Sequence, residues 1–363
     1  MLNITHAIDP PISLVIGHIG CGCRCAGFRG EPLPTPSALD PALIPFVTAG
    51  TLLAAKVDLT RIDPAAIHDG LLAAAQADLA PEQAQRAVQL LEMHDNAAAQ
   101  RWLADFRKAG ANIVYAVAFL GDPQDLPGVV IVPLSPTADA RAIAGLLVSG
   151  DASGPDKTTD PDAGREAISL NGAIVYGLTV QVEKMKLARP VHRPLLADAF
   201  ASLGDAPIQI VFSPSLVLQL VAGEMLPDRL PDAAGGAMPA DLMHSLTWAA
   251  LGASPPPDPF VHLLIQCTDA DGAQAYAGAL NALLTTLANN PDRCKLMPKM
   301  TQLVAALRPS LSGDLLTLNL DSTTLDRLIV PQAMLEFYST SLANAEQLKS
   351  HAKPSSAPAA PAN

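Results

Sequence analysis

"ARAIAGLL" (Ala140–Leu147) and "AQAYAGAL" (Ala273–Leu280) are two stretches of this chain that match at five of eight positions. Each follows an apolar run that ends in a small polar cluster containing Thr and Asp. A match of this kind at corresponding places along the chain is typical of an internal repeat. We therefore predict that the sequence contains two copies of one structural unit.

The segments around the two stretches recur in the same order. Asn112–Leu134 and Thr247–Cys267 each consist of an apolar run, a Pro/Asp turn and a second apolar run, a pattern that favours a β-hairpin. Strands are also expected at Thr51–Leu59 and Pro207–Ser213, each followed by a long helical stretch. The last pair of matching strands lies within Leu170–Gly177 and Leu311–Leu320.

The order strand–helix–strand–strand–helix–strand in each half is that of the ferredoxin-like split βαβ unit. We predict an α+β fold with two tandem ferredoxin-like repeats, mainly antiparallel sheets with helices packed on one face. The strand order expected within each half is 4-1-3-2. The predicted domains are a leader, a candidate export signal, with a proline-rich linker (1–40), repeat one (41–195), repeat two with a C-terminal helix (196–349) and a disordered tail (350–363).

Gly145 and Gly278 occupy equivalent places in the two matching stretches. Glycine inside a helix costs about 1 kcal/mol relative to alanine when the position is exposed. We expect each glycine to permit a close approach between its helix and a neighbouring element, so that a larger side chain would overpack the contact.

The composition excludes several classes of protein. Hydrophobic residues make up 49% and charged residues 16% of the 363 residues, which is too apolar for a disordered chain. The net charge of −12 argues against a nucleic-acid surface, because such a surface needs clustered Lys and Arg. The most apolar stretch, Ala42–Ala55, is too short for a transmembrane helix and contains Pro45. No nucleic-acid partner and no transmembrane helix are expected.

"GHIGCGCRCAGFRG" (17–30) places three cysteines at alternate positions and is followed by a proline-rich spacer, Gly30–Pro45. A short apolar stretch ending in Gly20 precedes Cys21, which is similar to a lipobox, so Cys21 is a candidate lipidation site. Three thiolates could instead bind a soft metal ion, although structural zinc sites usually have four ligands at wider spacings. An inert leader is the third interpretation. We favour delivery and predict no metal and no cofactor.

The layout from about Leu43 to Leu320 resembles uncharacterised exported bacterial proteins that carry two copies of such an α+β unit behind a signal or lipid-anchor sequence. The resemblance implies the fold and an exported, periplasmic or envelope-associated location. The location would be cytoplasmic if the N-terminal segment is not a signal. The resemblance implies no activity.

Three other groups of polar residues have the residue types of a candidate site. His262, inside "FVHLLIQC", is expected to be a strand histidine whose hydrogen bonds are satisfied rather than a metal ligand. Asp160–Glu166 is interpreted as a solvated charged loop rather than an acid–base pair. A basic cluster could dock an acidic partner, but we interpret it as a solvated connector between the repeats. The cluster consists of Lys184, Lys186, Arg189 and Arg193.

No nucleophile elbow, phosphate-binding loop, dinucleotide fingerprint or paired-histidine metal motif occurs in the sequence. No catalytic residue is therefore predicted. The leading hypothesis is a non-catalytic exported or cell-envelope protein that binds or scaffolds a protein partner. The alternative is a small-molecule or lipid-binding protein that uses an apolar cleft between the repeats. An enzyme of unrecognised type is the third hypothesis.

Overall fold

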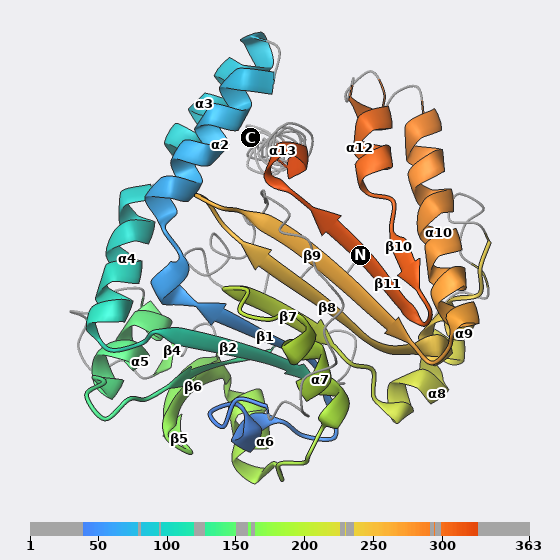
Figure 1. Ribbon diagram of the computed structural model, residues 1–363. Helices are drawn as coiled ribbons and strands as arrows, with labels where there is room; N and C mark the ends of the chain where they lie inside the picture. Colours follow the sequence, from blue (N-terminus) through green and yellow to red (C-terminus); the bar gives the residue numbers. More distant parts are fainter. Residues whose placement is uncertain are drawn as a thin grey trace, which may run out of the picture.

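The computed structural model describes residues 39–78, 81–93, 96–119, 128–149, 159–160, 164–225, 229, 236–290, 294 and 299–325. In this part of the chain the fold is α+β, with one continuous sheet and helices on both of its faces (Figure 1). The Cys cluster, the tail and most of the expected helix Thr323–Lys349 lie outside the described residues.

The first half of the chain contributes six strands, and its elements follow one another without mixing with those of the second half. In chain order they are η2 (Ile44–Phe46), β1 (Thr51–Asp58), η3 (Leu59–Arg61), α2 (Pro64–Asp78), α3 (Pro81–Met93), α4 (Asn96–Lys108), β2 (Ile113–Phe119), β3 (Val129–Pro133), α5 (Ala140–Ser149), β4 (Thr159–Asp160), β5 (Arg165–Leu170), β6 (Ala173–Leu178) and α6 (Thr179–Leu187).

The second half contributes five strands. Its elements are α7 (Pro194–Ser202), β7 (Ile208–Phe212), α8 (Leu216–Met225), α9 (Pro239–Ser245), β8 (Leu246–Ser254), β9 (Phe260–Cys267), α10 (Ala270–Asn289), α12 (Met300–Ala306), β10 (Ser310–Ser312), β11 (Leu315–Leu320) and α13 (Ser322–Thr324). All eight strands expected from the apolar runs are present.

Local sequence signals explain several of these boundaries. Proline begins α2, α3, α7 and α9, where its missing N–H costs no helical hydrogen bond. The Asp269 carboxylate caps α10 by accepting a hydrogen bond from the Gly272 backbone N–H at 2.7 Å. Asn171 and Gly172 both have positive φ angles of 49° and 76°, which suits the tight turn between β5 and β6.

The sheet has the strand order β10-β11-β9-β8-β7-β1-β2-β3-β6-β5-β4, and every neighbouring pair is antiparallel. The two halves meet where β1 pairs with β7. Read outward from this junction, the first half runs β1-β2-β3-β6-β5-β4 and the second runs β7-β8-β9-β11-β10. The two orders match over five strands, since a hairpin is followed in each half by a strand paired to its second strand, and the first half adds the short edge strand β4.

The ferredoxin-like prediction is not confirmed, and the expected order 4-1-3-2 is wrong. That order places the first strand of a half between the third and fourth strands, while the first and second strands are parallel, joined by a crossover connection and separated by the third. Here β1 pairs with β2 and β7 instead, and both pairs are antiparallel. The two halves also share one sheet rather than forming two.

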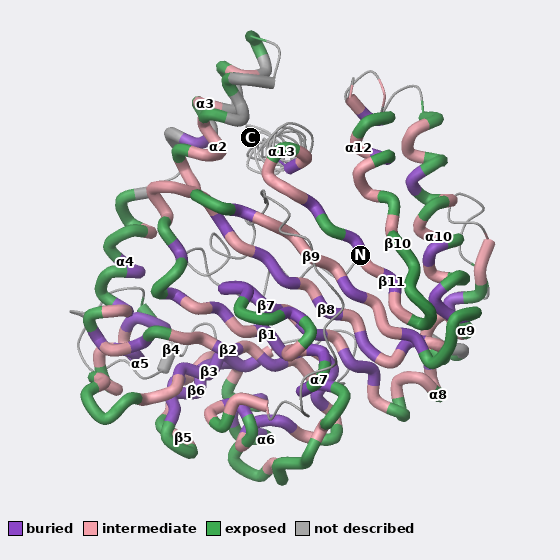
Figure 2. The backbone as a smooth tube through the Cα atoms, in the orientation of Figure 1, coloured by how far each residue is buried: buried purple, intermediate pink, exposed green. Residues whose placement is uncertain are grey.

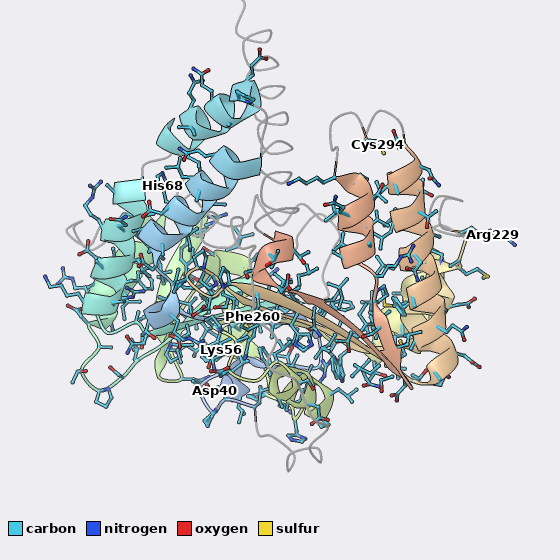
Figure 3. The ribbon with its side chains drawn as sticks, turned by 45° about the horizontal axis from the view of Figure 1, so that its top comes forward. Asp40, Lys56, His68, Arg229, Phe260 and Cys294 are labelled. Carbon is cyan, nitrogen blue, oxygen red and sulfur yellow. The ribbon has the colours of Figure 1, made fainter. Side chains whose placement is uncertain are left out.

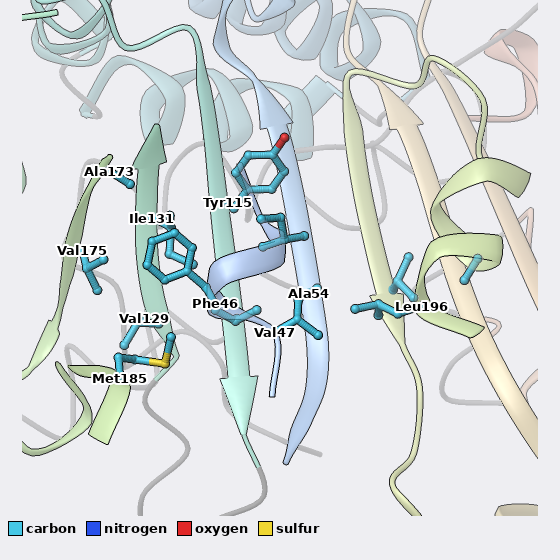
Figure 4. Packing of buried hydrophobic residues seen from close by; sticks show 14 of the residues in the cluster. Phe46, Val47, Ala54, Tyr115, Val129, Ile131, Ala173, Val175, Met185 and Leu196 are labelled. Atoms are coloured by element: carbon cyan, nitrogen blue, oxygen red, sulfur yellow. The ribbon is translucent and has the colours of Figure 1, made fainter. Parts of the chain in front are cut away.

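Helices cover both faces of the sheet, so the prediction of helices on one face is also wrong. On the first face, η2, α6 and α7 pack against strand residues that include Ala54, Tyr115 and Val211 (Figure 4). On the second face, α4 and α5 pack against residues that include Val57 and Ile208. The helices α10 and α12 pack together near the other end of the second face.

The proline-rich spacer ends earlier than predicted, because the chain joins the core before Pro45. Leu43 and Phe46 are fully buried against the first face of the sheet. The Tyr115 hydroxyl donates a hydrogen bond to the Asp40 carboxylate, which fixes the start of this segment. Burial of two large apolar side chains offsets the entropy of ordering the segment.

Candidate functional site

The structure separates the members of the predicted basic cluster. Lys184, Lys186 and Arg189 are exposed, as a solvated connector requires. Lys186 forms an ion pair with Glu183, and this hydrogen-bonded partner raises the Lys186 pKa. Arg193 behaves differently, because its guanidinium is partly buried and bonded to the backbone.

Arg193 joins the two halves of the chain. Its guanidinium donates hydrogen bonds to the Thr51 carbonyl oxygen at 3.0 Å and to the Ser213 carbonyl and hydroxyl oxygens at 3.2 Å. Weaker bonds reach the carbonyl oxygens of Thr48 and Ala49 at 3.5 and 3.3 Å. Thr51 begins β1 and Ser213 follows β7, so Arg193 fastens the junction strands together and is not part of a solvated connector. Burial lowers its pKa.

Glu166 was predicted to lie in a solvated loop, and this prediction is wrong. It lies in β5, where its Oε1 atom is buried and finds no hydrogen-bond partner among the described residues. Asp160 lies in the two-residue edge strand β4. The register pairs Asp160 with Arg165 and Glu166 with Gly177, so the two carboxylates are not cross-strand partners. The strand register thus does not pair them for acid–base chemistry.

Titratable and polar side chains lie in one cross-strand row on the first face. The row contains Tyr115, Lys56, Gln209, Gly252, His262 and Asn319. Neighbouring strands are about 4.8 Å apart, which places the first and fifth members roughly 19 Å apart. Groups at that separation cannot act on the same reacting atom.

Three of the groups in this row, Tyr115, Gln209 and His262, have a structural partner or are shielded by burial. Burial raises the Tyr115 pKa, and the bonded Asp40 carboxylate raises it further, so the phenol stays protonated (Figure 3 labels Asp40 and Lys56). The Gln209 amide donates a hydrogen bond to the Gly204 carbonyl oxygen at 2.8 Å. Burial lowers the pKa of His262, which favours its neutral form. This row supports the sheet and does not assemble a reactive pair.

The second face carries three cross-strand rows in which every side chain is apolar. The rows are Ala118-Leu53-Phe212-Ala249-Ile265-Leu316, Ala116-Ala55-Ile210-Leu251-Leu263-Leu318 and Val114-Val57-Ile208-Ala253-Val261-Leu320. They cross the junction between the halves. The third row is largely covered, because Val57, Ile208 and Ala253 belong to the core beneath α4 and α5.

The first two rows are less well covered at their centre. Seven half-buried side chains from β1, β7, β8 and β9 form what we call the central sheet patch (Figure 2 shows these strands). The patch consists of Leu53, Ile210, Phe212, Ala249, Leu251, Leu263 and Ile265. Among the described residues, five of these seven join none of the hydrophobic clusters; Ile210 and Leu263 lie at cluster margins. Helices α2–α4 rise on one side of this region and α10 and α12 on the other (Figure 1).

Exposed apolar side chains also gather on α8. Leu216, Val217 and Leu220 are 71%, 57% and 67% exposed. The helix contains no basic residue, and Glu224 near its C-terminal end is its acidic residue. The helix α8 begins four residues after Phe212, the last residue of β7 and a member of the patch.

Within the described ranges, no group of three or more His, Cys, Asp or Glu side chains is placed to hold a metal ion. None of the helices described there has the length and hydropathy needed to cross a bilayer. Comparison of the chain with models of known families, with curated proteins and with solved structures found no match.

The expectation that both matching glycines permit close contacts is wrong for Gly278. That residue is exposed, and a Cβ atom added there would meet nothing within 4 Å. The glycine of α10 that does permit a close approach is Gly272, whose added Cβ would lie 2.7 Å from the Ser245 Cβ. The matching stretch begins at the first residue of α5, but α10 begins at Ala270, about one turn before its matching stretch. Aligning the two stretches therefore selected Gly278 instead of Gly272, which lies in the first turn of α10.

The central sheet patch could not be found from one strand at a time. Its residues alternate with mostly apolar residues of the first face, so each strand reads as an apolar run with few polar interruptions. Such runs are typical of strands buried on both faces. Only the register shows that the less covered members lie side by side.

Proposed function

We propose that this chain is a non-catalytic binding protein whose ligand is a hydrocarbon chain held on the central sheet patch. One observation carries the proposal: the centres of two neighbouring cross-strand rows are wholly apolar and half-buried, and five of the seven side chains there join none of the hydrophobic clusters of the described residues. An apolar surface of this kind is favourable to cover, because covering it removes apolar area from water.

The dimensions of the patch fit a chain-like ligand. Four strands spaced about 4.8 Å apart give a length of roughly 14 Å, and two rows two residues apart give a width of about 7 Å. No side chain in these rows can donate or accept a hydrogen bond or carry a charge. The part of the ligand that contacts the patch is therefore a neutral hydrocarbon, such as the acyl chain of a lipid.

The proposal includes a tandem repeat. The two halves have matching strand orders over five strands from the junction outward, and both supply strands to the patch. Duplication of one α+β unit accounts for this order and for the matching stretches in α5 and α10. A ligand at the junction would contact both copies.

We also propose that the protein is exported and that Cys21 is its acylated residue. The support is the sequence "PISLVIGHIGC", in which a small residue precedes the cysteine. Fractionation of host cells that express a tagged full-length chain tests this. Protein beginning at an acylated Cys21 should sediment with membranes, and Cys21→Ser should release it. Mature protein that retains Met1 in the cytoplasm would contradict the proposal.

The binding proposal is tested by titrating the full chain with a fluorescent long-chain fatty acid. Leu251→Asn places an amide at the centre of the patch and should weaken binding at least tenfold, or about 1.4 kcal/mol. Ala249→Trp should weaken it similarly by filling the patch with an apolar side chain, which keeps the test valid if the first variant folds poorly. The matched control is Leu187→Asn on α6, which is 84% exposed and remote from the patch. Equal affinity in all four proteins would refute the proposal.

A further inference from the structure

The helix α8 carries an apolar surface that no described element covers. Leu216 and Val217 lie in its first turn, and Leu220 follows one turn later, so the three side chains project from one side of the helix. Exposed leucine and valine side chains of this number on one short helix are unusual on a soluble protein and mark interaction sites.

The helix is held firmly in place despite this exposure. The Gln219 side-chain amide donates hydrogen bonds to the carbonyl oxygens of Leu246 and Met243, at 3.0 and 3.4 Å. The Ser215 hydroxyl accepts a hydrogen bond from the Leu218 N–H at 3.2 Å, and Ala222 is buried on the opposite side. The exposed side chains are therefore presented outward in a fixed orientation.

The helix lies next to one end of the central sheet patch. Phe212, in the outermost row of the patch, is separated from α8 by only three residues. The bond from Gln219 to Leu246 attaches α8 to the first residue of β8, at the same end of the sheet. The opposite end of the patch, by contrast, borders the row covered by the core.

We propose that α8 docks on the surface of a lipid bilayer and places the open end of the patch against the lipid from which the ligand is taken. This inference rests on the proposed function. A membrane fits the surface better than a second protein copy does. A standard protein interface uses roughly 20–30 residues on each side, whereas α8 offers three large exposed side chains. Interfacial insertion needs no such extended complementary surface, because each apolar side chain that enters the lipid contributes separately.

The charges of α8 and of the chain as a whole favour one class of lipid headgroup. The exposed side of α8 carries no basic residue, and the chain has a net charge of −12. Anionic headgroups would therefore repel the protein, whereas zwitterionic headgroups would not. The docking surface is accordingly assigned to a zwitterionic bilayer.

Flotation of the full chain with phosphatidylcholine vesicles tests the assignment. The double variant Leu216→Ser/Leu220→Ser should reduce the vesicle-bound fraction at least fivefold, and vesicles containing phosphatidylglycerol should bind wild type more weakly. The control Leu187→Ser removes a more exposed leucine on α6 and should float like wild type. Fatty-acid binding without vesicles should be unchanged in the double variant, because α8 lies outside the patch.

Three results would overturn the docking assignment. They are equal flotation of the double variant and wild type, equal loss in the Leu187→Ser control, and a wild-type dimer that the double variant disrupts without any vesicle binding. Vesicle binding that depends on α8, together with no binding of fatty acid, would support the docking surface and overturn the proposed function instead.

Discussion

Replacing Arg193 should strongly destabilise the junction between the two halves. The guanidinium lies between β1 and β7, where it donates to the carbonyl oxygens of Thr51 and Ser213 at 3.0 and 3.2 Å. Both acceptor residues are fully buried. Arg193→Met keeps most of the side-chain volume but removes every donor, so the two carbonyl groups lose their charged partner.

The magnitude follows from these two bonds. A hydrogen bond that involves a charged group contributes about 1.5–3 kcal/mol, and a buried acceptor left without its partner loses that contribution. Arg193 is only partly buried, which lets water satisfy some of the freed acceptors. We expect Arg193→Met to lower the free energy of unfolding by about 2–4 kcal/mol. The stability of Arg193→Lys should lie between that of wild type and that of Arg193→Met. Lysine keeps the positive charge but lacks the planar fork that reaches both strands.

Urea unfolding, followed by the fluorescence of the two buried tryptophans, Trp102 and Trp248, measures the change. The matched control is Arg189→Met, the same substitution at an exposed position of the same connector, which should alter stability by less than about 0.5 kcal/mol. A loss below about 1 kcal/mol in Arg193→Met, or an equal loss in the control, would show that the carbonyl contacts do not hold the junction.

Three further predictions concern other parts of the fold. Gly278→Ala should raise stability by about 1 kcal/mol, whereas Gly272→Ala should lower it by about 1–2 kcal/mol through overpacking against Ser245; thermal unfolding that shows the same sign for both would contradict the packing. Burial, with nearby carboxylates, raises the Cys267 pKa to about 11. Peptide mapping after iodoacetamide treatment of the native protein at pH 8 should therefore find Cys267 unlabelled. The free energy of unfolding should fall as pH rises from about 9 to 11, because the thiol ionises more readily in the unfolded chain. Hydrogen bonds from Thr324 lower the Asp321 pKa, so Asp321→Ala should lower the free energy of unfolding by about 1 kcal/mol at pH 7. This difference from wild type should shrink as pH falls through the lowered pKa. Equal differences in urea titrations at pH 7 and pH 3 would contradict this prediction.

The positions of the strands could be predicted from the sequence, but their order could not. Apolar runs bounded by Pro, Gly and Asp identify β2, β3 and β9 with small errors at the ends. Which strands become neighbours depends on long-range pairing, and the preference for β1 to pair with β2 and β7 leaves no local trace in any one segment. The ferredoxin-like prediction rests on the order of helices and strands along the chain, and that order does not determine which strands become neighbours.

The roles of single residues were equally hard to predict when they depend on distant partners. Arg193 stands in a basic, proline-containing segment, and nothing nearby in the sequence indicates the carbonyl oxygens of Thr51 and Ser213 that it reaches. Leu43 and Phe46 lie in a proline-rich stretch, although the apolar run around them is a signal that could have indicated burial. The candidate lipidation site at Cys21 stays a prediction, because it lies outside the described residues.

Photocrosslinking measures directly where the ligand lies. A fatty acid with a diazirine near the middle of its chain would be bound to the full-length protein and irradiated, and the modified peptides identified by mass spectrometry. The crosslinks should fall in β7, β8 and β9, on residues such as Ile210, Phe212 and Leu251, and should be lost in Ala249→Trp. Crosslinks that fall on the first face or on α6, and persist in that variant, would contradict binding at the central sheet patch.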